Sequence, residues 1–390
     1  MPAWETERRV EEPSSDRSHR GPPRRAVAAA GHVPGLDGAR AIATLSVFCF
    51  HASWRTPLLR PLQPVLGHAD IGVEVFFILS GFLVVRPLVA HAVTGGRRVG
   101  AFDFWRRRIA RIWPAYLVAL VGAVVVGIGT VEGLSGWLKH GLLVDSWFED
   151  GGGTGLRPSW TLVVEVAFYA LILPLAALAA LARRRAHDAW VGLCIVLLAF
   201  GSWAIVETSY GPTAVQLRVL PPFLPAFAAG MLLAAAEVEP VPGTWFGGLL
   251  RGIRRLAAHP WVCGALAAGT FAAMVVLLRP SPTTPAFGFG FDRAAQSFGQ
   301  VVVGFLALAP LALRTADARW LEHRALLALG AASYGFYLWH VQVLRMVRPL
   351  LQGPPVVAVA GLALAVGGAF LAGDLSRRFI EQPARRALTR

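Results

Sequence analysis

Charged residues are scarce in this sequence, and that scarcity excludes an ordinary soluble protein. Asp, Glu, Lys and Arg make up 15% of the 390 residues, whereas hydrophobic residues make up 55% and the mean hydropathy is +0.54. Soluble globular proteins are about 25% charged and about 45–50% apolar. Apolar runs of about 20 residues recur along the chain, which is the length that a helix needs to cross a bilayer. The composition therefore predicts an all-α polytopic membrane protein.

Cysteine is also scarce, and its placement excludes a disulfide framework. Cys49, Cys194 and Cys263 each lie within an apolar run, and no pair has CxxC spacing. They are typical of small buried thiols. The His, Cys and Asp residues show no clustered spacing that indicates a metal site, so we expect no metal cofactor.

Acidic residues are outnumbered by basic ones, 23 against 37, which gives a formal net charge of +14. A charge of this size is typical of nucleic-acid-binding proteins. Here, however, the arginines lie in short clusters between apolar runs and do not follow one soluble face. Such clusters fit the positive-inside rule of membrane proteins, so we expect a lipid bilayer and no nucleic acid as a partner.

About ten membrane spans can be placed on the sequence. They lie near 36–54, 70–90, 112–130, 160–182, 189–207, 219–236, 260–278, 294–313, 325–346 and 355–374. With alternating spans, most basic residues fall on the side of the N-terminus, which predicts a plasma-membrane protein with both termini cytoplasmic.

Three regions follow from this placement. We expect residues 1–34 to form a disordered, basic and Pro-rich cytoplasmic arm, because they are charged and carry no apolar stretch of a secretory signal. Residues 35–376 would form the transmembrane domain, and residues 377–390 a basic cytoplasmic tail. We see no internal repeat and no appended soluble domain.

Four spans carry an ionisable residue in their outer halves. At about 1.5 Å of rise per residue, His51, Glu74, Glu165 and His340 fall at a similar depth. An ionisable group inside a membrane is costly unless it has a partner or a wet cavity. We therefore predict that these four residues line one hydrated pocket. A channel, a transporter and a two-sided active site would all need such a pocket, and periodicity alone does not decide between them.

Five sequence fragments in order carry a family resemblance. They are "GLDGARAIATLSVFCFH", "IGVEVFFILSGFLVVR", "FWRRRIARIWPAY", "SWTLVVEVAFY" and "SYGFYLWH", the last followed by "FIEQPARR". Together they resemble the acyltransferase-3 family of bacterial integral-membrane O-acyltransferases over almost the whole chain after residue 35. Two positions depart from the family pattern: Glu74 stands where Asp is frequent, and Val166 where many members have Glu.

The resemblance implies the transfer of an acyl group, most simply acetyl, from acyl-CoA to a hydroxyl. His51 would be the general base that takes the proton of the acceptor hydroxyl. Glu165 has two functional interpretations: it could orient His51, or it could hold acceptor hydroxyls. A third interpretation is structural, in which Glu165 forms an interhelical ion pair with Arg218.

A basic helix face is the candidate donor site. The Arg-x-x-Arg spacing places Arg108 and Arg111 on one face of a helix, where their guanidinium groups could hold the CoA phosphates. Arg40 begins the first span at the same inner mouth and is included in this site. The neighbouring Arg106 and Arg107 are expected to be ordinary topology-setting residues.

The remaining candidates would line the acceptor pocket. We assign this role to polar and aromatic residues near the predicted outer ends of spans, although packing and membrane-interface roles are alternatives for the aromatic ones. They are Glu74, Trp160, Tyr169, Arg218, Tyr334, Tyr337 and His340.

The acceptor class stays open at the level of sequence. A surface glycan, a glycolipid and a glycosylated natural product such as a macrolide are all compatible with the resemblance, and oligomers are possible. The lack of a fused extracellular domain in this sequence favours a lipid-linked or small-molecule acceptor. A transporter of acyl groups or glycolipids, without transfer chemistry, is the main alternative, because the sixth span is interrupted by prolines.

Overall fold

The computed structural model describes residues 31–94, 100–148, 155–182, 185–210, 218–238, 244–278 and 290–388. Within these ranges the regular structure is helical and contains no strand. The α-helices are α1 (Leu36–Ser53), α2 (Gln63–Leu66), α3 (Gly72–Thr94), α4 (Ala101–Val125), α5 (Gly133–Gly141), α6 (Trp160–Leu181), α7 (Ala186–Tyr210), α8 (Leu224–Glu237), α9 (Gly247–Ala257), α10 (Pro260–Leu277), α11 (Phe291–Ala312), α12 (Arg324–Met346), α13 (Arg348–Leu351), α14 (Pro355–Ser376) and α15 (Gln382–Leu388).

Seven helical segments of the described chain are long and apolar enough to cross a membrane. They are 69–92, 101–125, 157–181, 186–210, 260–277, 291–312 and 355–388. Large apolar side chains are exposed on the outside of the bundle, as Val359, Leu364 and Leu371 are on α14. An exposed apolar surface of this kind suits lipid and not water. The chain is therefore a multi-pass membrane protein.

The other three predicted spans also coincide with helices. These are α1, α8 and α12. α8 has 14 residues, and it is preceded by the short 3-10 helix η7 (Pro221–Phe223), where the sequence is interrupted by prolines. The crossing of all ten helices, and the side on which the termini lie, remain predictions.

Helix ends differ from the expected spans in two places. α4 begins at Ala101, so the arginine-rich segment lies inside this helix and not ahead of it. At the C-terminus the chain continues as a π-helical turn (Arg377–Glu381) and α15, which pack against α4. Most of the predicted N-terminal arm, residues 1–30, and the last two residues of the predicted tail lie outside the described residues.

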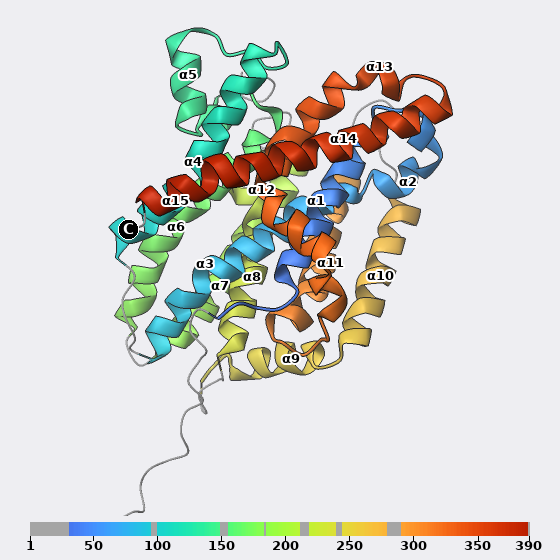
Figure 1. Cartoon of the computed structure of the whole chain (residues 1–390). Helices are drawn as coiled ribbons and strands as arrows, with labels where there is room; N and C mark the ends of the chain where they lie inside the picture. Colours follow the sequence, from blue (N-terminus) through green and yellow to red (C-terminus); the bar gives the residue numbers. More distant parts are fainter. Residues whose placement is uncertain are drawn as a thin grey trace, which may run out of the picture.

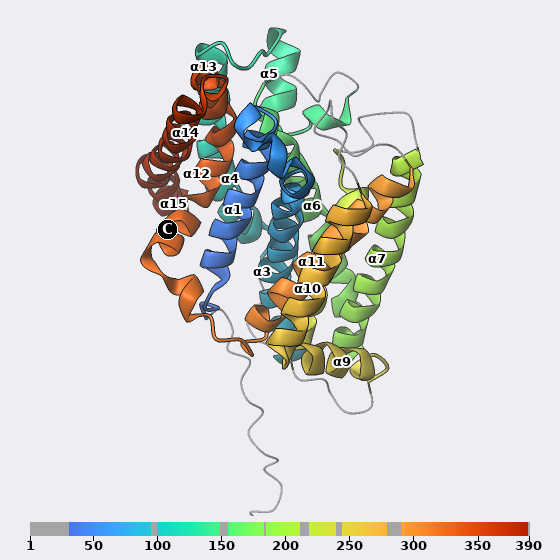
Figure 2. The same ribbon diagram turned by 90° about the vertical axis from the view of Figure 1, so that its right-hand side faces the viewer.

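The bundle has two distinct ends, which are visible in Figures 1 and 2. α1 begins near the end that α9 crosses, and α5 lies at the opposite end; we call these the α9 end and the α5 end. α9 is amphipathic: it buries Leu250 and Ile253 and exposes Arg251 and Arg255. A helix that lies flat with arginines outward is typical of a membrane–water interface.

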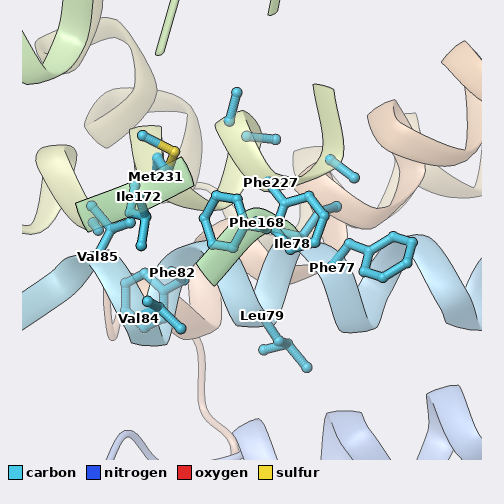
Figure 3. Close-up of a cluster of buried hydrophobic side chains, with 14 of the residues drawn as sticks. Phe77, Ile78, Leu79, Phe82, Val84, Val85, Phe168, Ile172, Phe227 and Met231 are labelled. Carbon is cyan, nitrogen blue, oxygen red and sulfur yellow. The ribbon is translucent and has the colours of Figure 1, made fainter. Parts of the chain in front are cut away.

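α3 lies at the centre of the bundle and packs along α8. Glycines allow the two backbones to approach closely, because a Cβ on Gly81 would overlap the carbonyl oxygen of Phe227 and one on Gly230 would overlap that of Ile78. Around this contact, the ring of Phe227 stacks on Phe168 of α6 with centroids 4.0 Å apart. Figure 3 shows these apolar side chains filling the space between the helices.

An ion pair closes the same helix contact at the α9 end. The Arg86 guanidinium of α3 donates to both carboxylate oxygens of Glu237 of α8, at 2.5 and 2.7 Å. Arg314 lies 3.3 Å from the same carboxylate. A forked pair of this geometry fixes the register of α3 on α8 as well as their separation.

The close approach of α3 and α8 predicts a strong effect of a single methyl group. We expect Gly230→Ala to destabilise the protein by about 1–3 kcal/mol or more, because the added Cβ must push the helices apart. Thermal unfolding of the detergent-purified protein measures this change. Gly248→Ala on α9 is the matched control, since nothing lies within 4 Å of its added Cβ. Equal melting temperatures for the two variants would contradict the packing described.

Candidate active site

Three cavities lie in series between the two ends of the bundle. The upper cavity, at the α5 end, has a volume of about 470 Å³, the middle cavity about 90 Å³, and the lower cavity, at the α9 end, about 290 Å³. Val73 and Tyr337 line both the upper and the middle cavity, while Arg40 and Leu83 line both the middle and the lower one. The three spaces therefore adjoin one another along the length of α3.

A pair of histidines stands at the upper cavity. His51, in the last turn of α1, lines this cavity, and the buried His340 of α12 lies beside it with ring centroids 5.1 Å apart. His340 Nδ1 is 2.6 Å from the carbonyl oxygen of Tyr337. A carbonyl oxygen only accepts, so Nδ1 carries the proton and Nε2 carries a lone pair. Two imidazoles are thus held together where a hydroxyl could be deprotonated.

One wall of the upper cavity is built from carboxylates and amides. Asp70 accepts hydrogen bonds from Gln300 at 2.6 Å and from Gln296 at 3.4 Å, and Gln296 Oε1 lies 2.6 Å from His68 Nδ1. One helical turn after Asp70, Glu74 lines the cavity with 8% of its surface exposed, and its Oε2 has no hydrogen-bond partner among the described residues. This wall can accept hydrogen bonds from hydroxyl groups.

Aromatic and basic side chains complete the upper cavity. Trp160, the first residue of α6, lies against Phe223 with ring centroids 5.3 Å apart. Arg218 lines the same cavity ahead of η7. Burial, together with the nearby Arg157, lowers the pKa of Arg218, whereas Asp145 acts in the opposite direction. The cavity therefore offers a flat apolar surface close to guanidinium groups.

The middle cavity is small and surrounds a carboxylate with arginines. Glu165 of α6 lines it together with Arg40, Arg108 and Arg111. The hydroxyl of Ser80 donates to Glu165 Oε1 at 2.8 Å. Hydrogen bonds of this kind hold the carboxylate in one orientation among the three cationic groups.

Two tyrosines position the arginine-bearing helix around the middle cavity. The hydroxyl of Tyr169 donates to the same Glu165 oxygen, and its ring lies under the Arg108 guanidinium at 4.9 Å. Tyr334 of α12 lines the cavity and donates to the carbonyl oxygen of Ile112 in α4 at 2.7 Å. At the boundary with the upper cavity, Thr161 donates to the Tyr337 hydroxyl at 3.1 Å.

The structure divides the predicted pocket into two. His51 and Glu74 do line one cavity, with His340 beside it, but Glu165 lies in the middle cavity among arginines. The estimated depths place all four residues near one another along the bundle. Depth does not fix the direction in which a side chain points, and Glu165 points into the middle cavity. The alternative ion pair between Glu165 and Arg218 stays a prediction, and the two residues line different cavities.

Sequence reasoning missed several residues that line the upper cavity. Gln296 and Gln300 lie one turn apart on α11, and this i, i+4 pair of amides within an apolar span was a usable signal. Arg55 and Arg157 give a weaker sequence signal, because each stands at the end of a span, where arginines commonly set the membrane topology. Among the described residues, no group of three or more His, Cys, Asp or Glu side chains could hold a metal ion.

Comparisons with known proteins give the family. The family model described as an acyltransferase domain matches residues 33–374. The chain is 28% identical to YrhL of Bacillus subtilis, provisionally named a peptidoglycan O-acetyltransferase, and 25% identical to the O-acetyltransferase OatA of Staphylococcus aureus. Each comparison covers 91% of this chain, but the chain spans only 55% and 57% of the length of these two relatives.

A third relative matches over nearly its whole length. The chain is 28% identical to the acyltransferase MdmB of Streptomyces mycarofaciens, over 92% of this chain and 93% of the relative. No solved structure matches the chain. The match of the domain model to most of the sequence is decisive, and the resemblance of the five fragments is confirmed: the chain belongs to the acyltransferase-3 family.

Proposed function

We propose that the protein is a membrane O-acyltransferase that moves an acyl group, most simply acetyl, from acyl-CoA to a hydroxyl of a sugar-containing acceptor. The observation that carries this proposal is the histidine pair at the upper cavity, adjoining a cavity that gathers three arginines. The family supports the class of reaction. The names of its relatives support O-acetyl transfer.

The donor would enter from the α9 end. The lower cavity can admit the anionic part of acyl-CoA, and Arg40 lies at its boundary with the middle cavity. Arg108 and Arg111 face the middle cavity, where guanidinium forks suit phosphate oxygens. At about 90 Å³ the middle cavity is too small for a nucleotide but suits a thin chain. We therefore place the CoA phosphates at its lower boundary, the pantetheine arm inside it, and the thioester at its upper boundary.

In the transfer step, His51 would carry the proton and His340 would support it. His51 takes the proton of the acceptor hydroxyl while the hydroxyl oxygen bonds to the acyl carbon. The bond from that carbon to the CoA sulfur then breaks, and the thiolate receives the proton from His51. His340, whose Nδ1 proton is held by the Tyr337 carbonyl, lies beside the His51 ring and would position it. The products are the acylated acceptor and free CoA.

The acceptor would occupy the upper cavity. Glu74 Oε2, which has no hydrogen-bond partner among the described residues, could accept hydrogen bonds from sugar hydroxyls, and the Trp160 ring offers a flat surface for a sugar. With ten spans and cytoplasmic termini in the plasma membrane, this cavity would face outward. A surface glycan, a glycolipid or a glycosylated natural product then reaches it without crossing the bilayer.

A transporter without transfer chemistry is the second candidate, because cavities in series also suit transport. Mass spectrometry of surface glycans, lipids and secreted metabolites from cells with and without the gene would identify the acceptor through a lost acyl increment. Release of free thiol from acetyl-CoA by purified protein and that acceptor then supports the enzyme. Flux across vesicles without thiol release would support the transporter.

The histidine pair gives the first catalytic prediction. We expect His51→Ala to lower thiol release from acetyl-CoA by about 100-fold or more, because general-base catalysis contributes about 10²–10⁴-fold. A thiol-reactive dye measures the rate. His259→Ala, at an exposed position before α10, is the control and should keep the wild-type rate. Normal turnover by His51→Ala would remove this residue from the mechanism.

The donor site gives the second prediction. We expect the double change Arg108→Gln and Arg111→Gln to weaken acetyl-CoA binding at least tenfold, because hydrogen bonds to charged groups contribute about 1.5–3 kcal/mol each. Isothermal titration calorimetry in detergent measures the affinity. Arg107→Gln, on the same helix but exposed, is the matched control. If the double variant and the Arg107→Gln control had the same small effect on affinity, Arg108 and Arg111 would serve only to set the membrane topology.

Glu165 gives the third prediction. Replacing it with Gln keeps the shape but removes the charge that accepts from Ser80 and Tyr169 among the arginines. We expect the free energy of unfolding to fall by about 1.5–3 kcal/mol, which lowers the melting temperature, and we expect a slower maximal rate. Differential scanning fluorimetry and the thiol assay measure the two effects. The exposed Glu132→Gln serves as the control, and unchanged values for both properties would show that the charge has no role.

A further inference from the structure

Arginines from four separate segments line the upper cavity. Arg55 follows α1, Arg157 begins the short 3-10 helix (Arg157–Ser159) before α6, and Arg218 precedes η7. The fourth, Arg293, lies in the first turn of α11. Residues so distant in the sequence meet here only because the tertiary structure brings their segments to one cavity.

Two of these arginines, Arg55 and Arg157, have no carboxylate partner in the described part of the chain, whereas Asp70 attracts Arg293 and Asp145 attracts Arg218. No ion pair joins Arg55, Arg157 or Arg293 to an acidic side chain there. Burial and the neighbouring guanidinium groups of Arg345 and Arg157 lower the pKa of Arg55 to about 10. Like charges gathered in a partly buried place repel each other, and a bound anion relieves that repulsion.

The arginines lie next to the reacting histidine. Arg55 Nη1 donates to the backbone carbonyl of His51 at 2.6 Å, which fixes the guanidinium one turn beyond the imidazole. The two carboxylates of the cavity, Asp70 and Glu74, are one turn apart on η2 and α3, and two glutamine amides hold Asp70. The cavity thus has a basic side near His51 and an acceptor wall for hydroxyl groups.

We infer that the upper cavity binds an oxyanion of the acceptor, a carboxylate or a phosphoryl group, between Arg55, Arg157 and Arg218. Guanidinium forks match the planar carboxylate and the phosphate oxygens with paired hydrogen bonds. Glu74 then accepts from hydroxyl groups of the same molecule. The acceptor is therefore an acidic sugar or a sugar phosphate, free or lipid-linked, and not a neutral or cationic glycoside. Its role as the acceptor rests on the proposed function.

Inorganic pyrophosphate is a direct probe of the basic group. Desulfo-CoA is first added to saturate the arginines of the middle cavity, Arg40, Arg108 and Arg111. Isothermal titration calorimetry on the purified full chain should then show pyrophosphate binding. We expect Arg157→Gln to weaken it at least tenfold, because charge-assisted hydrogen bonds are lost. Arg55→Gln should act in the same direction. Arg157 is exposed, so its variant should fold even if the Arg55 variant, which loses the bond to His51, does not.

Two controls assign any binding to the upper cavity. Arg60→Gln changes an exposed arginine in the same connection after α1 that does not line the cavity, and it should keep wild-type affinity. Arg108→Gln with Arg111→Gln should also keep it, since these residues line the middle cavity. Absence of pyrophosphate binding by the wild type, its abolition by desulfo-CoA, or its loss only in the inner double variant would each overturn the inference.

Matched sugars distinguish the source of the anion. Glucose, glucuronate and glucose 6-phosphate share a ring and differ in charge, and saturation-transfer NMR reports which of them binds. Preference for glucuronate indicates a carboxylate, and preference for glucose 6-phosphate indicates a phosphoryl group. In either case Arg157→Gln should remove the preference. Equal signals from all three sugars would overturn the inference.

Thiol release from acetyl-CoA, measured on the same preparations, tests the proposed reaction separately from the oxyanion site. Thiol release from acetyl-CoA without any anion preference would keep the enzyme and remove the oxyanion site. Anion binding that depends on Arg157, without thiol release for an acceptor identified by mass spectrometry, would keep the site and remove the proposed reaction.

Discussion

The contact between α3 and α8 is the constraint on which the arrangement of the site depends. Two glycines let the backbones of these helices meet, and the fork of Arg86 on Glu237 fixes how far one helix can slide along the other. Residues of α3 also line all three cavities in turn, from Glu74 through Ser80 to Leu83. A shift of α3 by one residue would therefore misplace the groups of every cavity at once.

Charge is distributed in layers along this axis. In the middle cavity, Glu165 offsets part of the charge of the surrounding arginines and is itself held by a serine and a tyrosine. In the upper cavity Asp70 offsets part of the charge of Arg293, whereas Arg55 and Arg157 form no ion pair with an acidic side chain of the described residues. An apolar environment raises the cost of every unbalanced charge, so each layer indicates where a charged ligand is expected. The two layers adjoin at Tyr337 and Val73, which line both cavities.

Much of the fold could be predicted because bilayer spans have a fixed length and a plain composition. All ten expected spans coincide with helices. The similar depth of His51 and His340 could be predicted, but their closeness also needs the packing of α1 against α12, which the structure shows. The place of Glu165 could not be predicted. The rotation of α6 about its axis is set by tertiary packing, including Phe168 on Phe227, and no pattern within one helix encodes it.

The basic upper cavity was hidden from the sequence for a related reason. Arg218 could be assigned to the acceptor pocket, but Arg55 and Arg157 are far apart in the chain, and each taken alone resembles an arginine that anchors a span end. Only their convergence distinguishes them from such anchors. The i, i+4 amides of α11 carried more information, because two glutamines on one face of an apolar helix need a polar partner, and Asp70 provides it.

The narrow middle cavity has a consequence for the cell that is separate from catalysis. A protein with water-accessible spaces that reach toward both faces of a bilayer can let protons leak across the membrane and dissipate the proton gradient. Here the narrowest space is flanked by three guanidinium groups, and fixed positive charge at a constriction excludes protons and other cations from a pore. In the proposed reaction, the same arginines would thus keep the membrane closed to cations while the constriction admits the acyl-bearing arm of the donor.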